Sequence, residues 1–265
     1  MQNTVPNSGI KSKSSLEKAL DILLLFDEDR RLLGINEISR LLKMPPSSVQ
    51  RLVNVLKKKG FLAQDVQTRK YKLGTIFLKF AGFVRESLDI AKVSYPIMQK
   101  LSRETGETVH LNVIDNWERV CIETIESTEP LMARMPVGHR SPLYSGASSK
   151  CLLAFSPRDF VEEYLNVVEF EKICVNTITD KDAFLKELER IRRAGYAESF
   201  SERVKGLGAL SAPVFGYERK LLASLSLAIP EVRFKDDRLR RLYVDKLVES
   251  AKEISSLLGY QTAEG

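Results

Sequence analysis

Two prolines, Pro45 and Pro46, constrain the fold of this chain more than any other feature. Apolar side chains recur at helical spacing before the pair, in residues 36–42, and after it, in residues 47–56. A proline fits the first turn of a helix and disrupts a helix interior, so one helix must end before the pair and another must begin at it. With a further apolar stripe in residues 16–26, the spacing predicts three short helices in the helix-turn-helix arrangement.

Two short apolar runs follow the third helix, at residues 61–63 and 71–74, and they flank a polar turn. Runs of this kind predict a β-hairpin, with Arg69 and Lys70 close to its tip. A hairpin in this position would form a wing beside the third helix. The sequence therefore predicts a winged helix-turn-helix domain over residues 15–74.

The positive charge of the chain is concentrated in the same segment. The chain has 41 basic and 35 acidic residues, and between Arg40 and Lys79 ten basic residues accompany only one acidic residue, Asp65. The 180 residues after position 85 hold 25 basic and 28 acidic residues. Such uneven charge indicates one domain that meets a polyanion and a near-neutral remainder with another task.

The third helix carries the side chains that would contact DNA. Small hydroxyls, Gln and Arg near the start of such a helix can read base edges in a major groove, and Lys or Arg can hold phosphates. The candidate DNA-contacting residues are Ser47, Ser48, Gln50, Arg51, Asn54, Lys57 and Lys58 in the helix, with Arg69 and Lys70 in the hairpin. The alternative is a protein-interaction module with a solvated basic face, but the element order, the turn and the one-sided charge favour double-stranded DNA.

Other classes of protein find no support in the sequence. The longest stretch without a charged residue has 12 residues, 206–217, whereas a membrane-spanning helix needs about 20. Residues 1–14 are predicted to be a disordered tail and lack the apolar segment of a signal peptide. The three cysteines are widely spaced without a C-x-x-C pair, which fits a cytoplasmic protein without a structural metal. No membrane partner, metal or cofactor is expected.

The remainder of the chain indicates an α+β domain. Helical spacing predicts a linker helix over residues 75–90, followed by a domain over residues 91–260. Strand pairs interspersed with helices point to an antiparallel sheet. Helices are predicted at residues 96–106, 148–155, 157–165, 180–194 and 235–258, and strands at residues 108–114, 120–125, 210–215 and 221–228, with 131–135 as a further candidate.

The search for catalytic residues finds none. His110 lies in an alternating apolar strand and is expected to be a packed core histidine, and His139 is expected to be a surface residue in a loop. The glycine-containing segment 206–211 lacks the third glycine of a dinucleotide-binding loop and precedes a strand instead of a helix. No phosphate-binding loop, metal-spaced histidine pair or nucleophile elbow appears.

The residues resemble the IclR family of bacterial transcription regulators. The resemblance begins with Leu-Glu-Lys-Ala-Leu-Asp-Ile-Leu at residues 16–23 and Tyr-Lys-Leu-Gly at residues 71–74. It continues in family order through the segments 106–111, 137–154, 193–197 and 206–215, so that it covers residues 15–258. It implies a GAF-like effector-binding fold in the C-terminal domain, a homodimer or dimer of dimers, and control of DNA binding by a small organic acid.

The resemblance also implies an effector pocket, with residues carried over position by position. These are Met132, Gly146, Ala147, Ser148, Ser199, Ala209, Ser226 and Ala228. Ala209 falls where some members have cysteine, Ala228 where some have serine, and Ser199 where an acidic residue can occur. This less polar set predicts a larger, partly apolar or aromatic carboxylate. Ser226 and the backbone amides of residues 146–148 would hold its charge, because the start of a helix attracts anions.

Three functions stay open at this point. The first is a dimeric, sequence-specific transcription regulator in the cytoplasm with a pseudo-palindromic operator. The second is an enzyme of hydrolase type with a nucleic-acid-binding appendage, which a buried His110 with a shifted pKa beside Cys121 or a serine would favour. The third makes the C-terminal domain a scaffold for oligomerisation, which a structure without a cavity between the Gly146 and Gly206 segments would favour.

Overall fold

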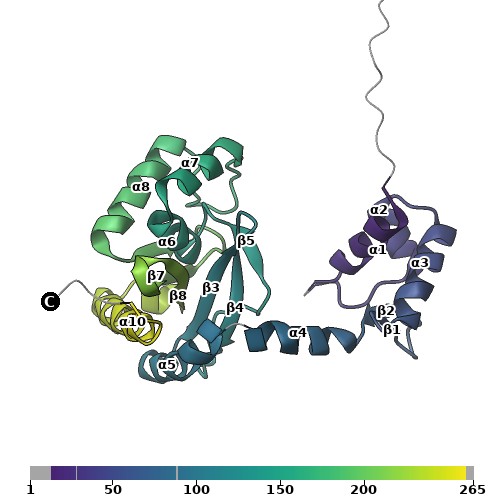
Figure 1. Cartoon of the computed structure of the whole chain (residues 1–265), viewed down its shortest axis with the longest axis horizontal. Helices are drawn as coiled ribbons and strands as arrows, with labels where there is room; N and C mark the ends of the chain where they lie inside the picture. Colours follow the sequence, from purple (N-terminus) through teal and green to yellow (C-terminus); the bar gives the residue numbers. More distant parts are fainter. Residues whose placement is uncertain (1–12, 28, 88, 261–265) are drawn as a thin grey trace, which may run out of the picture. The chain divides into compact units, whose positions relative to one another are not determined.

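The computed structural model describes residues 13–27, 29–87 and 89–260 (Figure 1). The chain divides into two compact units, and the division falls between Ser87 and Leu88. The predicted disordered tail lies outside the described residues, apart from Lys13 and Ser14. No helix in the described parts is both long enough and apolar enough to cross a membrane.

The N-terminal unit contains helices and one small antiparallel sheet. Its elements are α1 (Ser15–Leu24), α2 (Ile35–Leu42), α3 (Pro46–Lys58), β1 (Leu62–Gln64), β2 (Tyr71–Leu73) and α4 (Ile76–Ser87). Strands β1 and β2 form the hairpin, and Leu33 adds one isolated bridge to Tyr71. This is the predicted winged helix-turn-helix arrangement, with its core formed by one face of each of the first three helices.

Local signals set the limits of these helices. The Ser14 hydroxyl accepts a hydrogen bond from the Glu17 amide at 3.2 Å, and the Glu17 carboxylate accepts one from the Ser14 amide at 2.6 Å, which forms a capping box. Pro46 occupies the first turn of α3, where its missing N–H leaves no hydrogen bond unmade. The chain leaves α2 through Lys43, which adopts a left-handed conformation with φ of 52°.

The C-terminal unit is built on a six-stranded antiparallel sheet with the order β5-β4-β3-β8-β7-β6. The strands are β3 (Thr108–Asp115), β4 (Glu118–Ile125), β5 (Arg140–Pro142), β6 (Ala197–Phe200), β7 (Leu207–Phe215) and β8 (Leu221–Pro230). The helices are α5 (Asp89–Thr105), α6 (Ala147–Phe155), α7 (Arg158–Val167), α8 (Lys181–Ala194), α9 (Glu231–Phe234) and α10 (Asp237–Leu257), with a 3-10 turn, η1, at Tyr217–Arg219.

The two faces of this sheet differ in polarity. Figure 1 shows α5 and α10 on one side of the sheet and α6, α7 and α8 on the other. The face toward α5 and α10 is apolar and includes Leu111, Leu225 and Leu227, which are fully buried. Residues alternate between faces along a strand, so the neighbouring Ser224 and Ser226 lie on the α6 face, where they are equally buried. A buried polar face of this kind requires internal hydrogen-bond partners or a ligand.

Several predicted element limits are wrong. Residues 131–135 form no strand, and the Ala133 carbonyl accepts a hydrogen bond from the Thr108 hydroxyl instead of joining a ladder. Helix α5 begins at Asp89 and contains Pro96 in its interior, because its buried face, with Ala91 before Pro96 and Leu101 after it, continues across the proline. The last predicted helix, residues 235–258, corresponds to α10, and the short α9 before it was not predicted. Strands β5 and β6 were not predicted, because both are too short to show a pattern.

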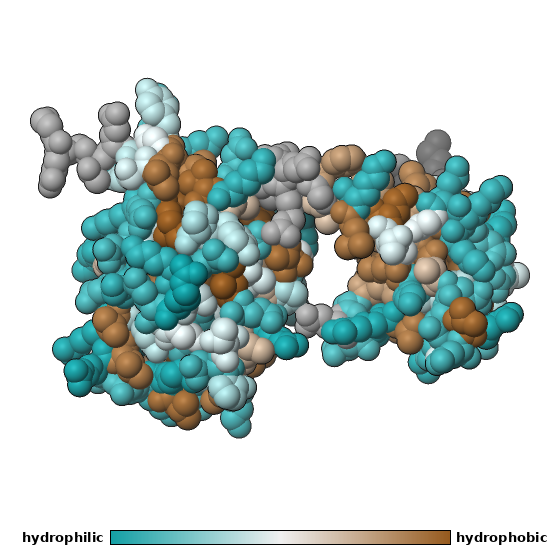
Figure 2. Space-filling model, turned by 90° about the horizontal axis from the view of Figure 1, so that it is seen from below, coloured by the Kyte–Doolittle hydropathy of each residue, from teal (hydrophilic) through white to brown (hydrophobic). Residues whose placement is uncertain are grey.

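On the face drawn in Figure 2, hydrophilic side chains cover much of the surface of both units, and apolar side chains gather in smaller groups.

Candidate nucleic-acid interface and buried polar site

Helix α3 presents a polar face to solvent. Ser47, Arg51 and Asn54 are exposed along this face, while Val49 and Val53 are fully buried in the core on the opposite side. Among the described residues, the Arg51 guanidinium has no hydrogen bond or ion pair. A free guanidinium near the start of an exposed helix can make a bidentate contact with a guanine edge or bind a phosphate.

Other candidate residues of α3 are held in place by neighbouring side chains. The Gln50 amide donates to Oδ1 of Asn54 at 3.0 Å and lies 3.5 Å from the Tyr71 hydroxyl oxygen, and Gln50 and Ser48 are half-buried. The two lysines near the end of the helix, Lys57 and Lys58, are exposed. The exposed face is therefore partly ordered before any ligand binds.

Gln64 links α3 to the hairpin, and sequence reasoning did not identify it. Its carbonyl oxygen accepts from Nζ of Lys57 at 2.9 Å, and its amide donates to the Arg69 carbonyl at 2.9 Å. The hairpin turn is closed by Asp65, whose carboxylate accepts from the Thr68 amide and hydroxyl, both at 2.8 Å. The Thr68 amide and then its hydroxyl hold the pKa of Asp65 below its usual value. These bonds fix the wing relative to the helix.

Arg69 and Lys70 differ in their availability for phosphate. Arg69 is exposed and has a left-handed backbone with φ of 60°. Lys70 forms an ion pair with Glu37 at 3.0 Å, and Glu37 also accepts a hydrogen bond from the Gly34 amide at 2.6 Å. The Gly34 amide and then Lys70 lower the pKa of Glu37. A phosphate contact by Lys70 would have to compete with Glu37, whereas Arg69 has no such competitor among the described residues.

The candidate effector residues of the sheet lie on its polar face. Ser199, Ala209 and Ala228 are register partners across β6, β7 and β8. Ser226 is opposite both Ser211 of β7 and His110 of β3. Gly146, Ala147 and Ser148 lie at the start of α6, and Met132 is half-buried between β4 and β5. The structure thus brings the sheet residues together in two adjacent rows.

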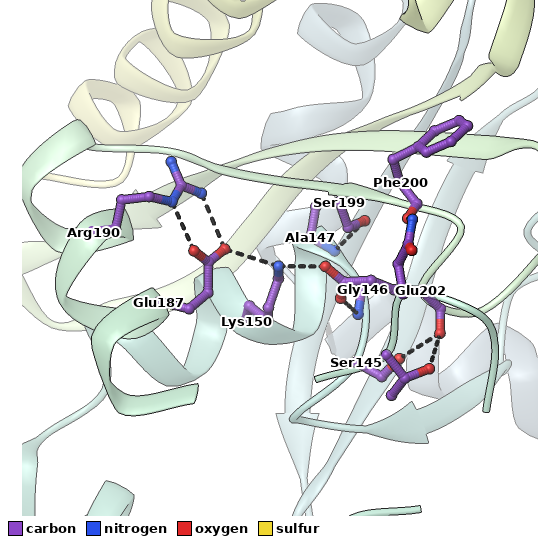
Figure 3. Close-up of polar contacts among 11 residues, drawn as sticks. Ser145, Gly146, Ala147, Lys150, Glu187, Arg190, Ser199, Phe200 and Glu202 are labelled. Atoms are coloured by element: carbon purple, nitrogen blue, oxygen red, sulfur yellow. Dashed lines mark hydrogen bonds and ion pairs between the residues drawn. The ribbon is translucent and has the colours of Figure 1, made fainter. Parts of the chain in front are cut away.

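Two of the three backbone amides that were expected to hold the effector, those of Gly146 and Ala147, already have partners within the chain. The Gly146 amide donates to Oε2 of Glu202 at 2.9 Å, and the Ala147 amide donates to the Ser199 hydroxyl at 2.9 Å (Figure 3). A carboxylate of the protein itself therefore occupies this anion-binding position. The sequence did not reveal it because residues 146 and 202 are far apart along the chain.

A buried ion-pair cluster stands beside this position. Nζ of Lys150 lies 2.6 Å from Oε1 of Glu202 and 2.9 Å from Oε1 of Glu187, and Arg190 binds the far side of Glu187 (Figure 3). The Lys150 side chain is only 2% exposed. A pocket of about 420 Å³ is lined by Lys150, Ser199 and Glu202, so a hollow lies beside one end of each of the segments 142–150 and 202–208. A domain that served only as a scaffold for oligomerisation was expected to lack such a hollow.

A line of hydrogen bonds crosses the polar face of the sheet. Nε of Arg119 donates to the Ser141 hydroxyl at 2.8 Å, and its Nη1 donates to Oδ1 of Asn112 at 2.9 Å. The Asn112 amide donates to the Ser226 hydroxyl at 3.3 Å, and Ser226 lies 2.8 Å from the Ser211 hydroxyl. The line joins β5, β4, β3, β8 and β7. This face is more polar than the carried-over residues alone indicated.

The two histidines both lie near cationic side chains. His110 is 2% exposed, and burial, followed by the charge of Arg119, lowers its pKa to about 3. His139 is half-buried and not a free surface residue as expected, because its Nδ1 lies 3.3 Å from Nη2 of Arg119. Burial and then the charge of Arg203 lower the pKa of His139 to about 4. Both rings are neutral near pH 7.

The arrangement gives little support to a catalytic role for His110. Its Nδ1 has no hydrogen-bond partner, and within the described chain it makes no hydrogen bond to a serine or cysteine. Burial raises the pKa of the Cys121 thiol to about 11. A nucleophile needs a base within hydrogen-bond reach or a lowered pKa, and neither is present at this pair. In the described regions, no group of three or more His, Cys, Asp or Glu side chains is placed to hold a metal ion.

Two family models match the chain. The model described as the IclR helix-turn-helix domain matches residues 15–66. The model described as the bacterial transcriptional regulator IclR C-terminal domain matches residues 83–256, which is more than half of the chain.

Relatives and solved structures agree with these models. The chain is 39% identical to the HTH-type transcriptional regulator KipR of Bacillus subtilis over 228 residues, which cover 86% of this chain and 90% of KipR. It is 35% identical to the HTH-type transcriptional regulator KdgR of Escherichia coli over 249 residues, 94% of each chain. The crystal structure of Thermotoga maritima IclR matches with a TM-score of 0.75 and 31% identity, over 93% of this chain and 99% of that one.

A more distant solved structure shares the fold. An IclR homologue from Microbacterium hydrocarbonoxydans, crystallised with 4-hydroxybenzoate, matches with a TM-score of 0.79 and 24% identity, over 92% of this chain and 99% of that one. The relatives at higher identity carry the names of transcriptional regulators, which removes the support for an enzyme with a DNA-binding appendage. The chain belongs to the IclR family of bacterial transcriptional regulators and is not an enzyme.

Proposed function

We propose that this regulator binds a specific double-stranded DNA operator through α3 and the β1–β2 hairpin, and that a small organic acid bound in the C-terminal unit changes its affinity for that operator. The observation that carries the proposal is the exposed face of α3, where Ser47, Arg51 and Asn54 project from a packed helix. Ser47, Ser48, Gln50 and Arg51 would contact base edges, with Asn54 beside them. Lys57, Lys58, Arg69 and, more weakly, Lys70 would bind phosphates. Such a regulator would act in the cytoplasm.

A second copy of the chain is the partner that we propose for the N-terminal unit. Leu16, Leu20 and Leu24 of α1 are spaced one turn apart and are 70%, 50% and 80% exposed. An apolar stripe of this length is unfavourable in water and is typical of an interface. A symmetric dimer predicts a pseudo-palindromic operator whose half-sites are a whole number of helical turns apart, each about 10 base pairs. The substitution Leu20→Lys should weaken the dimer, as measured by sedimentation.

The polar face of the C-terminal sheet supports a ligand with oxygen atoms. The related fold from Microbacterium hydrocarbonoxydans can hold an aromatic carboxylate, since that protein was crystallised with 4-hydroxybenzoate. In this chain the buried Ser211 and Ser226 hydroxyls and the Asn112 amide line the same face as Ala209 and Ala228. Both aromatic acids and hydroxylated or keto acids therefore belong in a screen for the effector.

DNA binding is tested by selecting genomic fragments that the full chain retains and measuring affinity by fluorescence anisotropy. Arg51→Ala should reduce operator affinity about 10- to 100-fold, with the loss concentrated at one base position. Arg158→Ala, which removes the same charge from an exposed site of the C-terminal unit, is the matched control and should leave affinity unchanged. No sequence preference in the retained fragments, or equal losses for the two variants, would contradict the proposal.

A further inference from the structure

The C-terminal unit buries a guanidinium group without a carboxylate partner. The Arg119 side chain is fully buried, and its hydrogen-bond partners are the neutral groups of Ser141, Asn112 and His139, with the Met135 sulfur at 3.5 Å. No carboxylate of the described residues lies within ion-pair distance of it. Burying an unpaired charge is costly, so such a group is expected to have a partner when the protein is at work.

Arg203, in the loop that follows β6, is a second cation without a partner among the described residues. A Cβ atom at Gly146 would lie 3.1 Å from Cδ of Arg203, so the Arg203 stem runs directly over Gly146. The guanidinium makes no hydrogen bond and no ion pair within the described chain, although the side chain is partly buried. The other buried cation among the described residues, Lys150, is paired with Glu187 and Glu202.

The positive charges of Arg119 and Arg203 affect the pKa values of the same neighbouring side chains. Burial and then the charge of Arg203 lower the pKa of Arg119 to about 10. The charges of Arg119 and Arg203, after burial, also lower the pKa of both His110 and His139. The histidines are therefore neutral, and the two arginines are the source of an uncompensated positive potential at the polar face. An anion placed between them would relieve both repulsion and desolvation.

Building on the proposed function, we propose that Arg203 and Arg119 anchor the carboxylate of the effector, and that this effector is a small organic acid with a further hydroxyl or keto oxygen. Arg203 makes the direct ion pair, because it is the more accessible of the two and has all its donors free. Arg119 supplies the second charge from inside the sheet. Pairing with guanidinium takes over the role that the sequence gave to the amides at the start of α6, because Glu202 already accepts from the Gly146 amide.

The second oxygen of the ligand follows from His110 and Ser226. Nδ1 of His110 is buried and has no hydrogen-bond partner among the described residues. Ser226 lies opposite His110 in the sheet register and belongs to the hydrogen-bonded line from Arg119. A hydroxyl close to the carboxylate can donate to or accept from Nδ1 of His110, and a keto oxygen can accept from it when Nδ1 carries the proton; neither disturbs the line. An acid with a wholly apolar body would leave that nitrogen unsatisfied.

The test measures binding of three acids to the full chain by calorimetry: pyruvate, D-gluconate and 4-hydroxybenzoate, each beside its neutral amide. We expect at least one acid to bind at least 10-fold more tightly than its amide. Arg203→Met should weaken that acid about 10- to 100-fold, because a charge-assisted pair is lost, while Arg203→Lys restores part of the affinity. Lys205→Met, which removes the same charge from an exposed residue of the same loop, should bind as the unaltered protein does.

A stability measurement separates this role from a structural one. Without any acid, Arg203→Met should melt at the same temperature as the unaltered protein or higher, since Arg203 makes no bond that is lost. Binding of acid and amide with equal affinity, an Arg203→Met variant that binds normally, or no binding of any of the three acids would each overturn the inference. Operator binding without acid tests the proposed function separately, because Arg203 lies outside the N-terminal unit.

Discussion

The two units of this regulator place their charges in opposite ways. In the N-terminal unit the cations lie on the surface, and Arg51, Lys58 and Arg69 are exposed on α3 and the hairpin. In the C-terminal unit several charges are inside: Lys150 and Arg119 are almost fully buried. Exposed cations can meet a long polyanion at little desolvation cost. A buried cation can be satisfied only by an internal carboxylate or by an anion small enough to enter.

Within the C-terminal unit, the cations differ in whether a carboxylate of the protein pairs with them. Lys150 has two carboxylates of the protein beside it, and so it belongs to the structure of the domain. Arg119 and Arg203 have none among the described residues, and we assign them to the effector. Removal of a paired and an unpaired buried cation should therefore have opposite effects on stability. The experiments below test this difference, beginning with the largest expected effect.

Breaking the cluster at Lys150 should cost the most. Lys150→Met leaves Glu202 buried without its cation, and the free energy of unfolding should fall by about 3–5 kcal/mol. The single tryptophan, Trp117, lies in the C-terminal unit with its ring stacked on Phe160 at 4.8 Å, so its fluorescence in urea reports on this unit. Arg158→Ala, which removes an exposed pair, should cost less than about 0.5 kcal/mol. An equally stable Lys150→Met variant would contradict a structural role.

Acid should destabilise the C-terminal unit through its histidines. The folded unit holds the pKa of His110 at about 3, below the ordinary 6.5, so the unfolded chain takes up a proton first as the pH falls. The contribution of neutral His110 to the free energy of unfolding is complete above pH 6.5 and is lost progressively toward pH 3. Between pH 7 and pH 5 the free energy of unfolding should fall by about 2 kcal/mol. In His110→Gln, the fall in the free energy of unfolding between pH 7 and pH 5 should be smaller by that amount. The chain has two histidines, both in this unit, and a flat profile for the unaltered protein would contradict the assignment.

Gly146→Ala should weaken both folding and acid binding. Gly146 has a φ of 90°, which an alanine adopts at a cost of about 1–2 kcal/mol, and the added methyl would press on the stem of Arg203. Gly138→Ala is the control, because it shares the positive φ of 86° and its Cβ would meet nothing within 4 Å. Similar loss of stability in both variants, with loss of acid affinity in Gly146→Ala only, is the expected result. If Gly146→Ala and Gly138→Ala bound the acid with equal affinity, the position of Arg203 would not depend on its contact with Gly146.

The smallest effects are expected in the wing. Arg69→Ala should lower operator affinity a few-fold and reduce the slope of log affinity against log salt by about 1, because one phosphate contact is lost. Lys70→Ala should change the slope less, since Lys70 is paired with Glu37. Anisotropy titrations at several salt concentrations measure both slopes. The opposite order would show that the Glu37 pair opens when DNA binds.

The N-terminal unit follows from its sequence because its signals are local. The Ser14 capping box, Pro46 in the first turn of α3 and the glycine after that helix each act on neighbouring residues. Its polar contacts were predicted less well: Gln64 was missed because a lone glutamine gives no pattern, and the Lys70–Glu37 pair joins residues 33 positions apart.

The polar site of the C-terminal unit could not be predicted because it depends on the order of the sheet. Asn112 reaches Ser226 only because β3 and β8 are neighbours, although 114 residues separate the two in sequence. Arg119 was not identified from the sequence, because apolar and polar residues are mixed in its strand. An arginine on the inner face of a strand was nevertheless a usable signal of a buried polar site. The Glu202 carboxylate at the Gly146 amide is a further contact of this long-range kind.

One measurement tests the central claim most directly: operator affinity with and without the acid that binds the full chain, in the unaltered protein, in Arg203→Met and in Arg51→Ala. The division of tasks predicts that the acid changes affinity at least several-fold in the unaltered protein and not in Arg203→Met. Arg51→Ala should bind DNA weakly in both conditions while its affinity for the acid is normal. An acid effect that persists in Arg203→Met, or acid binding that is lost in Arg51→Ala, would contradict it.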